Sequence, residues 1–101
     1  FYEPVMQVTL RREKMDCIEM AVFPHEDPAP GGALAKFDGV KPSDQGCIIY
    51  LHTDNLAATL DRVNSAGGSC VFGPLELADD IGTIALFIDS EGNRIGLHQP
   101  A

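Results

Sequence analysis

The pattern of apolar and polar positions is clearest in the second half of the chain. Residues 47–53 form a continuous apolar run, which predicts a buried strand. Residues 55–66 then carry leucine and valine at helical spacing, which predicts an amphipathic helix. We expect Thr53 or Asp54 to cap the start of this helix, and the glycine pair that begins at Gly67 to end it.

Three further strands are predicted after this helix. The candidates are residues 69–72, 83–88 and 93–98, each rich in strand-forming residues. A Gly-Pro pair is expected to stop the first of them, and the turn sequence Asp-Ser-Glu-Gly separates the other two. The second half therefore has the order strand, helix, strand, strand, strand.

The first half repeats the end of that order. Residues 1–6 fit a short helix, and the strand candidates are 8–15, 17–24 and 33–38, with a loop rich in proline and glycine at 25–32. The similarity lies in the order of elements more than in the residues themselves. The repeat predicts two similar βαβββ units, of which the first lacks its opening strand.

The closing hairpin predicts which side chains share a face of the sheet. If Asp89 pairs with Asn93, alternation along the strands puts one wholly apolar set on the face that the helix covers: Ala85, Phe87, Ile95 and Leu97. The opposite face then mixes apolar and polar side chains and is the candidate wall of a cleft: Ile84, Leu86, Ile88, Arg94, Gly96 and His98.

Two long stretches resemble one known superfamily. They are "GCIIYLHTDNLAATLDRVNSAGGSCVFGP" and "IGTIALFIDSEGNRIGLHQP", and together they resemble the second module of the vicinal oxygen chelate superfamily, which includes glyoxalases, bleomycin-resistance proteins and extradiol dioxygenases. The resemblance implies an α+β fold in which two βαβββ modules present facing, curved mixed sheets that form a cleft. It also implies a homodimer, sometimes with modules exchanged between subunits.

The resemblance extends over the whole chain and suggests its organisation. We expect a single domain over residues 1–101, with module one at 1–38, a linker at 39–46 and module two at 47–101. The first strand of module one is absent from the sequence shown. By typical strand and cap lengths, about a dozen residues are expected before Phe1.

Metal-using members of the superfamily place His, Gln or Glu ligands on the first and last strands of each module. The corresponding positions here are Ile48 (Cys47 with a one-residue slip), Gly96, and Ala33 or Ala35, and a fourth position lies upstream. None of the three is a His or a carboxylate, and one remaining ligand cannot hold a catalytic divalent metal. We therefore expect no cofactor, with a divalent metal as the disfavoured alternative.

The predicted ligand-binding cleft combines residues of both modules: Met20, Val22, Ile48, Tyr50, His52, Leu86, Arg94, Gly96 and His98. His52 and His98 can border the cleft on neighbouring strands, but partly solvated histidines at strand ends are the simpler interpretation. Tyr50 presents its ring to a ligand or is a core tyrosine, and the two readings are evenly weighted. Arg94 can hold a ligand carboxylate or phosphate, although an ion pair with Asp89 or Glu91 is favoured.

Charge and composition exclude several classes of function. The formal net charge of −8 disfavours nucleic-acid binding, which needs clustered Lys and Arg, and fits a protein with an apolar or cationic ligand. No run is long enough for a membrane helix. Cys17, Cys47 and Cys70 lie in apolar segments and are expected to be buried thiols in the reducing cytoplasm, not nucleophiles. His25, although close to two acidic residues, lies in a loop where side chains usually point to solvent.

These observations favour a cytoplasmic small-molecule binding protein that sequesters its ligand without a catalytic metal. The alternative is a metal-dependent lyase, isomerase or dioxygenase of the glyoxalase type with displaced ligands, so enzymatic activity is left open. A partner-binding domain without a ligand is the third hypothesis, and a cleft filled by the protein's own side chains would favour it.

Overall fold

The structure is a computed structural model that describes residues 1–29 and 31–101. Position 30, inside the predicted loop 25–32, lies outside the described residues. In chain order the elements are α1 (Tyr2–Met6), β1 (Arg11–Met15), β2 (Ile18–Val22), β3 (Ala33–Lys36), β4 (Tyr50–His52), α2 (Leu56–Ser65), β5 (Ser69–Leu77), β6 (Gly82–Ile88) and β7 (Arg94–Gln99).

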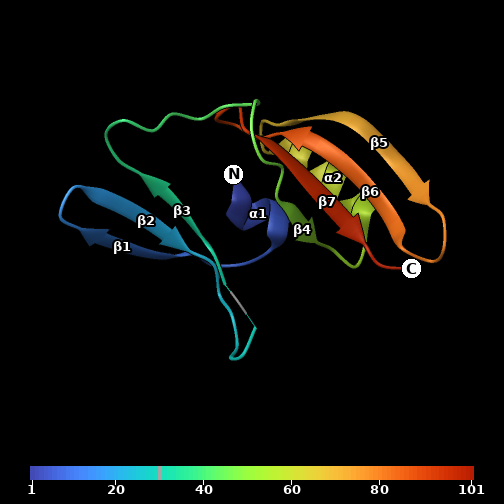
Figure 1. Ribbon diagram of the computed structural model, residues 1–101, viewed down its shortest axis with the longest axis horizontal. Coiled ribbons are helices and arrows are strands. Elements are labelled where there is room, and N and C mark those ends of the chain that lie inside the picture. The colour runs from blue at the N-terminus through green and yellow to red at the C-terminus, as the bar shows by residue number, and fades with distance from the viewer. Residues whose placement is uncertain (30) are drawn as a thin grey trace.

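The strands form two sheets (Figure 1). Strands β1, β2 and β3 make an antiparallel sheet in that order, and the second sheet has the order β4-β7-β6-β5. In the second sheet β4 runs parallel to β7, while β5, β6 and β7 are antiparallel. A helix followed by three strands thus occurs in both halves, and β4 adds the opening strand only in the second half of the described chain. The predicted α+β repeat is confirmed.

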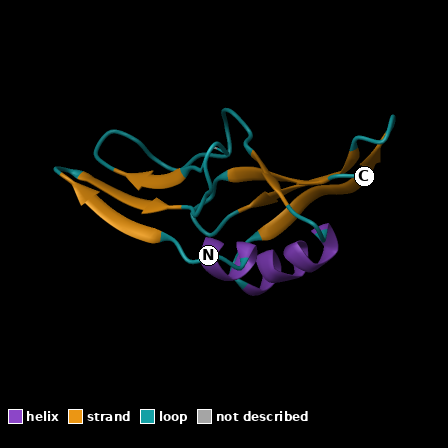
Figure 2. Ribbon diagram, turned by 90° about the horizontal axis from the view of Figure 1, so that it is seen from below, coloured by secondary structure: helices purple, strands orange, loops and turns teal. Residues whose placement is uncertain are grey.

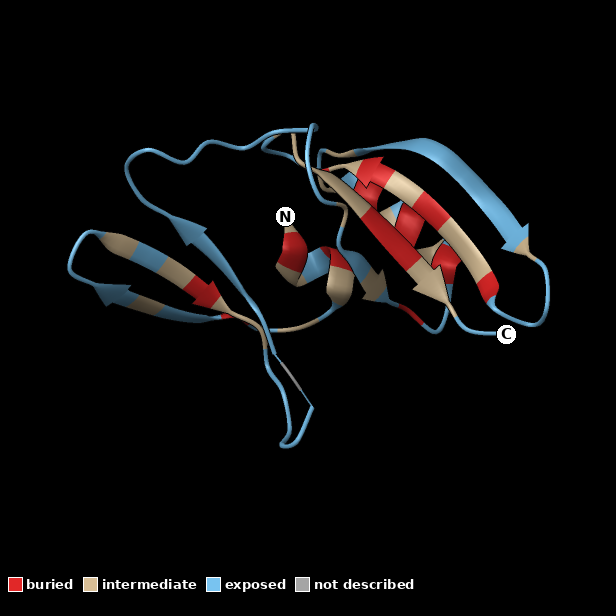
Figure 3. Cartoon of the chain, viewed as in Figure 1, coloured by how far each residue is buried: buried red, intermediate tan, exposed pale blue. Residues whose placement is uncertain are grey.

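Both helices lie on the same side of the sheets, so that each sheet keeps one face open (Figure 2). One cluster of buried side chains joins α1, α2, the inner face of the four-stranded sheet and the start of the first sheet: Tyr2, Val5, Leu10, Ala21, Leu56, Leu60, Val63, Ala85, Phe87 and Leu97. Figure 3 shows this burial: buried positions are interspersed with partly buried ones along β6, and a buried band lies in the middle of β7. The open faces of the sheets are therefore left for other contacts.

The N-cap of α2 differs from the prediction. Asn55, not Thr53 or Asp54, caps the helix, and its side chain accepts a hydrogen bond of 3.1 Å from the backbone N–H of Ala58. Thr53 instead lies buried two residues before this cap, with its hydroxyl 2.7 Å from the Thr59 hydroxyl. Three adjacent residues can all cap a helix, and only the backbone direction after β4 decides among them.

Two strand boundaries also differ from the prediction. β5 continues through Gly73 and Pro74 to Leu77, with shifts of register around Phe72. A proline is tolerated there because β5 is an edge strand with one side free of ladder hydrogen bonds. β4 is shorter than the predicted strand at 47–53, because its single neighbour β7 pairs with it only over Tyr50–His52, with flanking hydrogen bonds at Ile49 and Thr53.

The expectation of buried cysteines is wrong, since the structure exposes all three thiols. Cys17 lies in the turn between β1 and β2, Cys47 precedes β4, and Cys70 is on the edge strand β5. Apolar neighbours in the sequence predict burial only where the strand is covered, and these positions are at turns or edges. None of the described helices is long and apolar enough to cross a membrane.

Candidate functional site

The closing hairpin has the predicted register. The backbone N–H of Asp89 donates to the carbonyl of Asn93 at 2.9 Å, and Ile88 pairs with Arg94 across the hairpin. Gly92 closes the turn with a φ of 93°, a conformation that favours glycine. The hairpin therefore fixes which residues of β6 and β7 point to the helices and which point away.

The helix-covered face is the apolar set that was predicted. Ala85, Phe87 and Leu97 have no exposed surface, and they pack against the buried face of α2. Ile95 of the same set is partly buried against this cluster. All the side chains that alternate with them lie on the opposite, open face.

On the open face, paired residues line up in rows across the four strands. One row joins Tyr50, Gly96, Leu86 and Phe72, and the next joins His52, His98, Ile84 and Leu75. Tyr50 and Phe72 are each 47% exposed and Leu75 is 43% exposed. These rings and aliphatic chains are thus accessible to solvent on the side of the sheet away from the helices.

Gly96 and Tyr50 fit together at the centre of this face. A Cβ atom at position 96 would come within 2.5 to 2.9 Å of three carbon atoms of the Tyr50 ring. The ring therefore lies directly on the glycine backbone, where any larger residue would displace it. An aromatic ring over a strand glycine is a known way to cover backbone that lacks a side chain.

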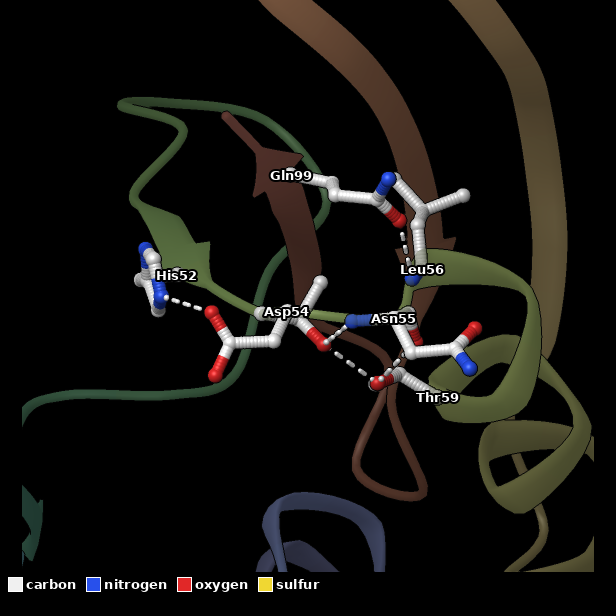
Figure 4. A network of polar contacts seen from close by, with 7 residues as sticks. His52, Asp54, Asn55, Leu56, Thr59 and Gln99 are labelled. Atoms are coloured by element: carbon white, nitrogen blue, oxygen red, sulfur yellow. Dashed lines mark hydrogen bonds and ion pairs between the residues drawn. The ribbon is translucent and has the colours of Figure 1, made fainter. Parts of the chain in front are cut away.

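The two histidines of the open face are paired neighbours, as their strands predicted. The Nε2 atom of His52 lies 3.0 Å from a carboxylate oxygen of Asp54, and Nε2 of His98 lies 2.7 Å from the carbonyl oxygen of Ile81. Figure 4 shows His52 and Asp54 at the end of β4, beside the start of α2, where the Gln99 side chain accepts from the backbone N–H of Leu56 at 2.7 Å. Each imidazole therefore has a local partner.

Arg94 does not pair with Asp89 or Glu91 as expected. Its guanidinium lies 3.9 Å from a carboxylate oxygen of Asp44 in the segment between the two sheets. Asp89 is unavailable because it is buried and accepts hydrogen bonds from the backbone N–H groups of Glu91 and Asn93. The register also points Arg94 toward the open face and away from the turn.

A buried polar pair that no local sequence pattern predicts joins the two halves. The Tyr2 hydroxyl in α1 donates to a carboxylate oxygen of Asp89 at 2.6 Å. Burial tends to raise the pKa of Asp89, but hydrogen bonds from Tyr2, Asn93 and Glu91 outweigh it and hold that pKa below its usual value. Burial, then the bond to Asp89 and its charge, raise the pKa of Tyr2. The turn sequence around Asp89 contains nothing that indicates a hydrogen bond from Tyr2.

Met20 and Val22 lie on the open face of the other sheet. The adjacent Ala21 is buried in the core, so its two neighbours on β2 point the opposite way. Their sheet and the four-stranded sheet lie at opposite ends of the long axis (Figure 1). A cavity of about 290 Å³ borders Val22, and another of about 380 Å³ borders His52, but neither contains residues of both sets. The predicted cleft residues are thus divided between two surfaces of this chain.

The positions that the resemblance assigns to metal ligands hold neither a His nor a carboxylate. Ile48, Ala33 and Ala35 lack donor side chains, and the Tyr50 ring covers Gly96. Across residues 1–29 and 31–101, no three His, Cys, Asp or Glu side chains come close enough to hold an ion. His25 lies 3.8 Å from Asp27 in an exposed loop.

No protein-family model and no curated protein sequence matches the chain. Solved structures do match it. Glyoxalase I from Zea mays superposes with a TM-score of 0.64 at 19% identity over 97% of this chain, which spans 39% of that protein. A mutant of the same enzyme gives a TM-score of 0.67 at 19% identity, with the same shares covered.

A smaller protein with the same fold aligns over the whole chain. TnmS3, an antibiotic binding protein from Streptomyces sp. CB03234, has a TM-score of 0.71 at 24% identity, and the alignment covers 100% of this chain and 82% of that one. These likenesses establish the fold that the sequence resemblance implies. The chain has the paired-module architecture of the vicinal oxygen chelate superfamily, with few helices and two sheets.

Proposed function

We propose that this chain is a small-molecule binding protein that holds an apolar ligand on the open face of its four-stranded sheet. The observation that carries the proposal is the row of accessible apolar side chains on that face, with Tyr50 resting on Gly96 at its centre. Contiguous apolar surface that a folded protein leaves open commonly marks a binding site. Helices cover the other face of the sheet, so only the open face is accessible to a ligand.

Likeness to an antibiotic binding protein supports binding without turnover. The alignment with TnmS3 leaves little of either protein unmatched, whereas this chain spans 39% of the maize glyoxalase I. Sequestration requires only a surface that fits the ligand, and it needs no reactive group. We therefore favour sequestration over turnover. A screen of compounds identifies the ligand.

We propose that the ligand is bound without a catalytic metal. A divalent metal of this superfamily needs His or carboxylate ligands on the strands that line the cleft, and this chain has apolar residues there. A carboxylate at position 96 would also displace the Tyr50 ring. The residues present favour apolar contact over Lewis-acid chemistry.

A homodimer is part of the proposal, because the binding face needs a second wall. In one chain the two sheets lie at opposite ends of the long axis and both turn their open faces away from the helices, so these faces do not face each other (Figures 1 and 2). A second copy that brings the face of β2 opposite β6 and β7 would reunite Met20 and Val22 with Tyr50 and Leu86. The cytoplasmic location stays a prediction, without the support of buried cysteines.

The second candidate is a glyoxalase-type lyase, isomerase or dioxygenase with displaced metal ligands. The pairing of His52 with His98 on adjacent strands favours this candidate, because two neighbouring imidazoles can supply two of the ligands that a metal site needs. Both histidines already have local partners, and the strands around them add no carboxylate on that face. We rank this candidate below binding.

A thermal-shift screen of the purified protein tests the proposal. The screen uses apolar, anionic and cationic compounds, once with EDTA and once with nickel, zinc, iron or manganese. We expect a subset of apolar compounds to raise the melting temperature equally in both conditions. Stabilisation that requires a metal, together with stoichiometric metal in the purified protein, would support the enzyme instead, and a screen without any shift counts against both.

A further inference from the structure

The open face of the four-stranded sheet carries a guanidinium in a strongly acidic protein. The chain has a formal net charge of −8, yet the charged side chain that these strands place on this face is that of Arg94, beside the imidazoles of His52 and His98. The only carboxylate within the described strands β4 to β7 is that of Glu76, which pairs with Thr83 on the helix side. The binding face therefore complements an anion better than a cation.

Arg94, the cation of this face, lies at the start of β7 and is weakly engaged. The 3.9 Å between Arg94 and Asp44 exceeds the 2.7 to 2.9 Å of a charge-assisted hydrogen bond, so Asp44 does not use the donors of the guanidinium. The Asp44 side chain is 49% exposed, in a segment without helix or strand. A ligand carboxylate can replace Asp44 without leaving a buried charge unpaired.

Tyr50 offers a flat surface beside this cation. One side of its ring lies on Gly96, and the residue is 47% exposed. The paired aromatic rings of the described residues belong to Phe1, Tyr2, Phe23 and Phe87, all on the helix side, so the Tyr50 ring has no stacking partner there. Gly96 and Arg94 are two residues apart on β7, a spacing of about 6.6 Å that fused aromatic rings can span.

From this juxtaposition we infer that the ligand is a planar aromatic carboxylate. Its ring stacks on Tyr50 and contacts Leu86, and its carboxylate takes the place of Asp44 on Arg94. The inference rests on the proposed function. It specifies a planar aromatic ring as the apolar part of the ligand and adds a negative charge. Tyr50 then selects planar rings, and Arg94 selects the negative charge.

Calorimetry with matched probes tests each part. Naphthoate is compared with decalin carboxylate, which is saturated, and with naphthamide, which is neutral. We expect naphthoate to bind about two- to tenfold more tightly than the saturated acid and about tenfold more tightly than the amide. Y50L should abolish the first preference and Y50F should keep it, while R94Q should abolish only the second.

A second variant covers the case in which Y50L does not fold. Gly96 has no positive φ, so the G96A substitution is compatible with the backbone conformation. The added methyl group displaces the Tyr50 ring from the backbone of residue 96. It should lower the aromatic preference with Tyr50 still present, and melting curves establish that each variant is folded.

Three results would overturn the inference. They are equal affinity for naphthoate and the saturated acid, an aromatic preference that survives both Y50L and G96A, and failure of all three probes to bind. In the first two cases a small molecule still binds, and chemical-shift mapping of the bound probe decides whether it lies on the open face, as the proposed function requires. In the third, the wider screen decides whether the proposed function fails as well.

Discussion

Replacing Tyr2 with phenylalanine should destabilise the fold through one hydrogen bond. The Tyr2 hydroxyl donates to buried Asp89 at 2.6 Å, and the substitution removes this donor while keeping the ring in the core. Asp89 retains the backbone N–H groups of Glu91 and Asn93 and the Asn93 side chain, so its charge is not left unpaired. A hydrogen bond to a charged group contributes roughly 1.5 to 3 kcal/mol, so we expect a loss of about 2 kcal/mol.

The size of this loss should depend on pH. The pKa of Asp89 is lower in the folded protein than in the unfolded chain, because hydrogen bonds to the carboxylate outweigh its burial. Ionised Asp89 therefore stabilises the fold above the unfolded pKa of about 4, and this contribution is lost as the pH falls through the folded pKa. The difference between Tyr2→Phe and wild type should be full at neutral pH and shrink in acid.

Urea unfolding of both proteins at several pH values measures this difference. At neutral pH the melting temperature of Tyr2→Phe should also fall by roughly 8 to 16 °C. Tyr50→Phe is the matched control, because the Tyr50 hydroxyl makes no hydrogen bond within the described residues, and its effect should stay within about 0.5 kcal/mol. A loss no larger than the control's, or one that persists unchanged in acid, refutes the reasoning.

Three further predictions concern the rest of the fold. Asn55→Ala removes the cap of α2 and should cost about 1 kcal/mol, whereas Asn64→Ala, exposed on the same helix, should cost nothing measurable. Phe87→Ala should cost about 3 to 5 kcal/mol, because the ring is fully buried, and the exposed Phe72→Ala should cost far less. All three thiols of the native protein should react promptly with a thiol reagent, and slow reaction before unfolding would contradict their exposure.

The sequence predicted the elements and faces that depend on local pattern. The register of the last hairpin followed from Asp89, Asn93 and Gly92, and from it the apolar and open faces of β6 and β7. Side-chain alternation carries that information along a strand without knowledge of the rest of the fold. Order of elements likewise predicted the repeat of one helix and three strands.

Contacts between distant segments could not be predicted in the same way. Nothing near Asp89 points to Tyr2, and Arg94 has nearer carboxylates in the sequence than Asp44. These pairs depend on how α1 and the linker pack on the second sheet, which no local pattern encodes. The cysteines were placed wrongly for a related reason, since burial depends on what covers a strand.

The contact between the Tyr50 ring and Gly96 was predictable in part from the sequence. The sequence predicted that the two residues share a face, and it identified Gly96 as the position where a metal ligand was missing. Only the parallel pairing of β4 with β7 brings the ring onto the glycine. That contact makes the position without a metal ligand the centre of the proposed binding surface.

Amide chemical-shift mapping by NMR in the presence of EDTA tests most directly whether the open face of the four-stranded sheet binds a small molecule without a metal. The probe is the compound that raises the melting temperature most in the screen. We expect the shifts to concentrate on the strands of the open face, around Tyr50, Leu86 and Gly96, and to spare the outer surface of α2. Shifts confined to the helices, or binding that disappears with EDTA, would contradict this expectation.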